Sequence, residues 1–104
     1  MATHKEKEQE KLKLLYDIYE QPMYRIAYAI LHHTEQAEDA VSDAFLRILK
    51  NLKKIGDVRS EKTKHYIISI IRSTAINQYR QNQRDSERYT VWDDRILQVP
   101  NQKD

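Results

Sequence analysis

Glycine and proline are almost absent from this sequence, and their scarcity limits the folds that the chain can adopt. One glycine and two prolines occur in 104 residues. A sheet-rich domain of this length needs many tight turns, and glycine and proline are the residues that most often form them. Charged residues make up 33% of the chain with both signs abundant, which suits helices that bury one apolar stripe and solvate the rest. We therefore predict an all-α fold, a compact bundle of three to four helices.

Apolar residues recur at spacings of three and four along three stretches, which predicts three long helices. These stretches are residues 12–31, 34–55 and 61–83. The chain length suits one domain with a modest core. We divide the chain into a flexible lead-in over residues 1–11, a helical domain over residues 12–84, and a linker or short C-terminal helix over residues 85–104.

Four residues are predicted to begin, break or end these helices. Pro22 predicts a break in the first helix, because proline is tolerated best in a first turn. Thr34 is the expected N-cap of the second helix, and Ser60 is the expected N-cap of the third. Gly56 is expected in the left-handed conformation that often follows a helix end.

The sequence contains no motif that indicates an enzyme. There is no cysteine, no HExxH pair, no glycine-rich phosphate loop and no nucleophile beside a base. His32 and His33 are adjacent and cannot share one helix face. We expect no catalytic residue, no metal and no cofactor. Apolar runs fall short of the roughly 20 residues that cross a bilayer, so we expect no membrane contact. The absence of cysteine is compatible with a reducing compartment, and we expect a cytoplasmic protein.

Acidic and basic residues occupy different stretches of the chain. Residues 34–46 hold four acids and no base, whereas residues 62–84 hold five bases and no acid. The second stretch also carries amides and tyrosines, and such a mixture can neutralise phosphates, bond base edges and stack unpaired bases. Solvated helix surface and helix-dipole bias are simpler explanations taken alone, but the dipole explains Asp43 poorly. The acidic surface is also suited to dock a basic partner helix.

Two runs of residues, in this order, resemble the region 2 domain of sigma factors of the extracytoplasmic-function (ECF) group in the sigma-70 family. Residues 37–46 resemble the family pattern A-E-D-x-V-Q-[ED]-x-F-[LI], and residues 66–80 resemble W-L-x-x-I-x-R-N-x-A-I-D-x-x-R. Residues 16–27 also look like the first helices of that domain. The resemblance spans about residues 12–84.

The resemblance implies a promoter-recognition module that takes part in transcription initiation. It implies docking on the clamp helices of the RNA polymerase β′ subunit through Glu38, Asp39, Ser42, Asp43, Leu46 and Leu49. It implies contact with the non-template strand of the promoter −10 element through Lys62, Lys64, His65, Tyr66, Arg72, Ser73, Asn77, Tyr79, Arg80 and Arg84. An anti-sigma factor is a further partner that the family suggests.

Within these roles, three arginines would hold phosphates: Arg72, Arg80 and Arg84. Ser73 and Asn77 would lie near base edges, and the loop of residues 57–65 would hold a flipped base.

Three positions depart from the family pattern. Tyr66 replaces a tryptophan, Ser73 an asparagine and Asn77 an aspartate, and the shorter serine side chain places the base preference in question. The family also carries a helix-turn-helix region 4, which is expected to be absent from this chain, either by trimming or by nature. Two alternatives stay open: a sigma-like protein-interaction module or regulator without promoter activity, and a small stand-alone helical DNA-binding protein.

Overall fold

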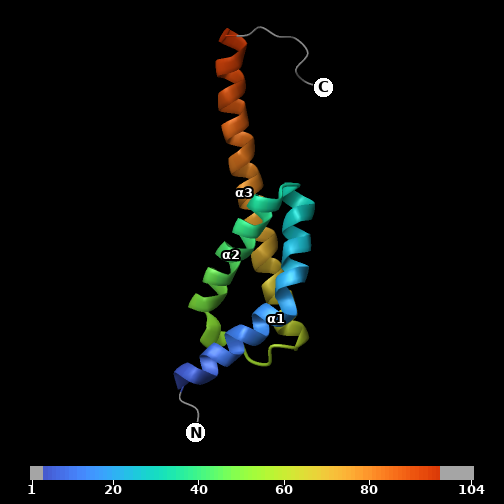
Figure 1. Cartoon of the computed structure of the whole chain (residues 1–104), viewed down its shortest axis with the longest axis vertical. Helices are drawn as coiled ribbons and strands as arrows, with labels where there is room; N and C mark the ends of the chain where they lie inside the picture. The colour runs from blue at the N-terminus through green and yellow to red at the C-terminus, as the bar shows by residue number, and fades with distance from the viewer. Residues whose placement is uncertain (1–3, 97–104) are drawn as a thin grey trace.

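Three long helices form the fold, in agreement with the all-α prediction (Figure 1). The computed structural model describes residues 4–96, and side chains are described for residues 6–87. Within this part no strand forms. The elements are α1 (His4–Leu31), α2 (Thr34–Lys50), the short 3₁₀ helix η1 (Leu52–Lys54) and α3 (Glu61–Ile96).

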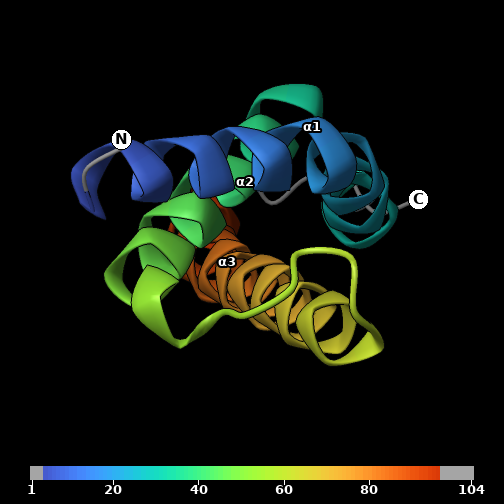
Figure 2. The same cartoon turned by 90° about the horizontal axis from the view of Figure 1, so that it is seen from below.

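Helix α1 is longer than predicted and bent. It already begins at His4, and it continues through Pro22 without an interruption. The break predicted from Pro22 was therefore wrong, and the proline produces a bend instead. Proline donates no hydrogen bond, and its ring crowds the carbonyl of Ile18 one turn earlier, which kinks a helix. The blue first part of α1 and its cyan second part run in different directions (Figure 1, Figure 2).

Two histidines make the tight connection between α1 and α2. His32 adopts a left-handed backbone with φ of 54°, and its N–H donates to the carbonyl of Tyr28 at 2.8 Å. This is the αL arrangement that closes many helices, here without the usual glycine. The N-cap of α2 is His33, whose Nδ1 accepts from the Gln36 N–H at 3.3 Å. The prediction of Thr34 as the cap was thus wrong by one residue.

Helix α2 ends earlier than predicted, at Lys50, and η1 carries the chain onward. Gly56 does not have a positive φ, so its expected left-handed conformation was wrong. A Cβ at this position would meet nothing within 4 Å, so neither backbone nor space requires glycine here. A 3₁₀ turn, and not a left-handed glycine, follows the end of α2.

Helix α3 begins where the sequence predicted. The Ser60 Oγ accepts from the Thr63 N–H at 3.1 Å, which confirms Ser60 as the N-cap. The helix then continues well past the predicted end near residue 83, as far as Ile96. Figure 1 shows its last part projecting alone beyond the bundle. Residues 97–104, part of the expected linker or short helix, lie outside the described residues.

One hydrophobic core joins the three helices. Its fully buried large side chains are Leu15, Met23, Ile48, Ile67 and Ile71. Burial of each such side chain stabilises the fold by roughly 1.5–3 kcal/mol relative to exposure. Helices α1 and α2 run antiparallel with α3 packed against both, so α2 and α3 each keep one solvent-facing side (Figure 2).

Candidate functional site

The acidic residues of α2 lie on the solvent-facing side of the helix. All six residues predicted there are exposed, and they share one face opposite the buried face: Glu38, Asp39, Ser42, Asp43, Leu46 and Leu49. Leu46 is 59% exposed and Leu49 is 48% exposed. Large apolar side chains left in water beside unpaired acids are typical of a contact surface. We call these six residues the acidic face.

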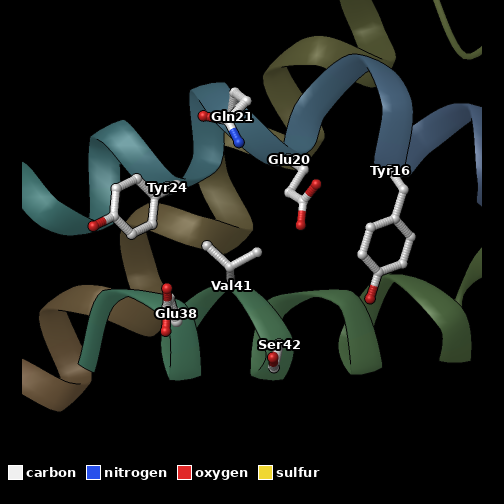
Figure 3. A pocket seen from close by; sticks show the side chains of 7 residues that line it. All are labelled: Tyr16, Glu20, Gln21, Tyr24, Glu38, Val41 and Ser42. Carbon is white, nitrogen blue, oxygen red and sulfur yellow. The ribbon is translucent and has the colours of Figure 1, made fainter. Parts of the chain in front are cut away.

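A hollow of about 440 Å³ adjoins the acidic face between α1 and α2 (Figure 3). Figure 3 shows Glu20 of α1 directed into this space, with Tyr16 and Tyr24 on either side. Its lining is completed by Gln21, Glu38, Val41 and Ser42. Of these residues only Glu38 and Ser42 were predicted from the sequence, although Tyr16, Glu20 and Tyr24 recur every four residues on α1. Two carboxylates and two tyrosines can receive a basic side chain.

An aromatic stack supports this hollow from the core side. The rings of Tyr16 and Phe45 lie 3.8 Å apart between centroids, with an angle of 6° between their planes. Phe45 is buried, whereas Tyr16 is 38% exposed. The stack therefore fixes α1 against α2 at one end of the hollow.

The ten residues predicted to contact DNA belong to α3, but they do not share one face. Six of them recur at spacings of three, four and seven, and so form one stripe: Lys62, Tyr66, Ser73, Asn77, Arg80 and Arg84. A second stripe, about a third of a turn away, contains His65, Arg72 and Tyr79. Lys64 belongs to neither stripe. All ten are exposed except Tyr66, which is half-buried.

A basic residue of α2, Arg47, contacts the first stripe. The Arg47 guanidinium donates to the Ser73 Oγ at 3.4 Å, and the Ser73 hydroxyl lies 3.5 Å from the Ile70 carbonyl, to which it donates. Arg47 was not among the predicted residues, because it lies on α2, outside the basic stretch of residues 62–84. The Ser73 hydroxyl is thus engaged by the protein itself, which leaves Asn77 as the freer polar group of the pair.

A larger hollow, of about 780 Å³, opens where the loop after η1 meets the start of α3. Its lining is Asn51, Lys54, Ile55, Gly56, Asp57, Ser60, Lys62, Thr63 and Tyr66. We call it the loop hollow. Hydrogen bonds fix its rim, since the Thr63 hydroxyl donates to the Asp57 carbonyl at 2.7 Å and the Ser60 N–H donates to the same carbonyl at 3.1 Å.

Tyr19 of α1 holds the same loop from the core side. Its hydroxyl donates to the Val58 carbonyl at 2.7 Å. Burial raises the pKa of Tyr19 above its ordinary value of 10.0, and the nearby Glu61 and Asp57 carboxylates raise it further, while Arg59 lowers it. The phenol therefore keeps the proton that this hydrogen bond requires.

Removing the Tyr19 hydroxyl should have a pH-dependent effect on stability. Tyr19→Phe should cost about 1 kcal/mol at neutral pH, the usual net worth of a hydrogen bond. The raised pKa favours the protonated folded form, so its stabilisation is complete below the unfolded pKa of 10.0 and declines as the pH rises through the folded value. Urea unfolding of both proteins should show the difference shrinking above about pH 10. A constant difference would contradict this role.

Comparison with known proteins identifies the fold. The sequence matches the Sigma-70 region 2 family over residues 15–85. The chain belongs to the sigma-70 region 2 family. It is also 32% identical over 75 residues to a protein of Bacillus subtilis (strain 168), the ECF RNA polymerase sigma factor SigX. That alignment covers 72% of this chain and 38% of SigX, so the chain spans about two fifths of the length of its relative. No solved structure matches.

The sigma region 2 match confirms the resemblance seen in the sequence, and it contains both stripes of α3, the acidic face and the loop hollow. The family is not one of enzymes, as predicted. Within the described part of the chain, no group of three or more His, Cys, Asp or Glu could hold a metal ion. None of the helices described there is long and apolar enough to cross a membrane.

Proposed function

We propose that this region 2 domain is the promoter-recognition module of an ECF-type sigma factor, which docks on RNA polymerase and helps to open the promoter −10 element. One observation carries the proposal: the acidic face and the basic stripes lie on different helices of one small bundle. A protein that joins polymerase to DNA needs two surfaces of opposite charge that do not compete for one partner.

The acidic face is the proposed polymerase surface. The exposed Leu46 and Leu49 would form the apolar centre of the contact. Asp39 and Asp43 would pair with basic side chains of the clamp helices of the β′ subunit. The neighbouring hollow would accept one long basic side chain between Glu20 and Glu38. Its aromatic walls would contact the stem of that side chain.

The first stripe of α3 is the proposed DNA surface. Arg80 and Arg84 would contact phosphates, joined by Arg72 from the second stripe and by Arg47 from α2. Asn77 can donate and accept hydrogen bonds at a base edge. Tyr79 is 45% exposed and offers a ring on which an unpaired base can stack.

The loop hollow is the proposed site for one base of the non-template strand. A base that leaves the duplex loses its stacking and pairing energy, and a hollow that accepts only the extruded base compensates for this loss. The Tyr66 ring lines the hollow and can stack on the base. Promoter opening by this route stabilises the melted state and requires no bond cleavage, so no catalytic group is needed.

Binding titrations with three probes test the proposal: the β′ clamp-helix fragment, a single-stranded 12-mer pool of random sequence, and the same pool as duplex. We expect micromolar or better binding to the fragment and a preference for single strands over duplex. Tight duplex binding without fragment binding would instead favour a stand-alone DNA-binding protein. Fragment binding without any DNA binding would favour a sigma-like interaction module.

Arg80→Ala should weaken single-strand binding by several-fold at all sequences. Loss of one phosphate contact should also reduce the slope of log affinity against log salt by about 0.7. The matched control is Arg25→Ala, which removes an exposed basic side chain of α1 that is distant in sequence from both stripes. An unchanged slope in Arg80→Ala, or an equal change in the control, would count against a phosphate contact at this position.

A further inference from the structure

A lysine of the lead-in reaches across the bundle to the end of η1. The Lys11 ammonium donates to the Ile55 carbonyl at 2.6 Å and lies 3.3 Å from the Leu52 carbonyl. These partners are 44 and 41 residues away along the chain. An ammonium group has three donors, and carbonyls at a helix end carry partial negative charge, so the contact is favourable in both chemistry and charge. Lys11 lies before the segment that matches the family.

Tyr19 makes the second contact of this kind, two helical turns after Lys11. Residues 11, 15 and 19 share one side of α1, and Leu15 between the two donors is fully buried. One donor holds the Ile55 carbonyl and the other holds the Val58 carbonyl. The side chains of Ile55 and Val58 are themselves buried. Helix α1 therefore anchors the backbone on both sides of Gly56 and Asp57.

The anchored backbone is the wall of the loop hollow. Ile55, Gly56 and Asp57 all line it, and the Asp57 carbonyl is held from the other side by Thr63 and Ser60. Gly56 has open space around it, so its own packing does not set the position of this wall. The shape of the hollow thus depends on bonds from α1 that lie behind the wall and do not line the hollow.

We infer that Lys11 and Tyr19 are positioning residues that hold the loop hollow in the shape that receives an unpaired base. This inference rests on the proposed function and adds a requirement to it: base capture depends on a side chain outside the family segment. A site that is correctly shaped only part of the time binds more weakly in proportion to that fraction. Loosening the wall should therefore weaken base capture without changing any group that contacts the base.

Three variants of the full chain separate this role from general stability. Lys11→Met removes the donors and keeps most of the stem, Lys11→Arg restores charge and donors, and Lys13→Met is the control. Lys13 is an exposed neighbour on the same helix. The first measurement is hydrogen exchange at the Ile55 and Ser60 amides, which donate to Leu52 and Asp57. The second is affinity for the single-stranded 12-mer pool, and the third is affinity for the clamp-helix fragment.

Lys11→Met should speed exchange at both amides and weaken oligonucleotide binding, each by about tenfold, the usual order for loss of a charged hydrogen bond. Fragment affinity should stay unchanged, Lys11→Arg should recover most of the loss, and Lys13→Met should match wild type. Unchanged exchange, or faster exchange with unchanged DNA affinity, would overturn this inference but would not contradict the proposed function. If wild type binds no oligonucleotide, the proposed function fails first and the inference fails with it.

Discussion

The Asp43→Arg variant should lose about a hundredfold or more in affinity for the clamp-helix fragment. Asp43 is exposed in the middle of α2, beyond the turns where a helix dipole would explain a carboxylate. Truncating one partner of a buried charge pair costs about 2–5 kcal/mol at an interface. Reversal goes further, because it places like charges against each other. Fluorescence titration of the labelled fragment measures this loss.

Fold and net charge must be controlled in this experiment. Glu10→Arg makes the same change in net charge at an exposed position of α1 that precedes the family segment and is not one of the six residues of the acidic face. Both variants should melt close to wild type, since exposed substitutions usually change stability by less than about 0.5 kcal/mol. If Asp43→Arg still binds the fragment, the acidic face is not the surface that binds it.

The acidic face could be predicted from sequence because its evidence is local. The buried side of α2 repeats every three to four residues, so the exposed side follows without knowledge of any neighbour. The Ser60 cap was predicted for the same reason, since its partner Thr63 lies three residues away. The family pattern then suggested a particular partner for this surface, RNA polymerase, which charge alone did not.

The other parts of the site depend on contacts between residues far apart in the chain. The hollow of Figure 3 exists because Glu20 and Glu38 come from antiparallel helices. Arg47 joins the α3 stripe across 26 residues, and Lys11 reaches Ile55 across 44. Periodicity assigns each residue to a face of its own helix, but it does not say which faces meet. These contacts became visible only when the helices were placed together.

Two of the wrong predictions concern residues whose conformational preference was taken as decisive. Pro22 bends α1 and does not end it, because the helix packs on the core on both sides of the bend through Tyr19 and Met23. Gly56 was predicted to have a left-handed backbone after α2, but it has none. The left-handed residue is His32, which follows α1. At Pro22 tertiary packing overrides a local cost of about 3 kcal/mol, whereas Gly56 only permits a left-handed backbone and does not require it.

Phe45→Ala should have the largest effect on stability of the changes considered, about 3–5 kcal/mol of the unfolding free energy. Phe45 is 4% exposed and stacks on Tyr16 across the α1–α2 contact. Its loss leaves a cavity and removes the aromatic pair, which contributes about 0.5–1.5 kcal/mol beyond area. A domain of this size has only about 5–15 kcal/mol in total, so the variant should lose a large share of its stability. Urea unfolding followed by circular dichroism measures the change.

Phe45→Leu separates the core from the stack. It keeps most of the buried volume, so it should cost about 1–2.5 kcal/mol, from imperfect packing and the lost aromatic pair. Because the stack holds α1 against α2, this folded variant should also bind the clamp-helix fragment a few-fold more weakly if the hollow contributes to docking. Equal affinity would confine docking to the exposed face of α2. A loss below about 1 kcal/mol in Phe45→Ala would show that the stack does not hold the two helices together.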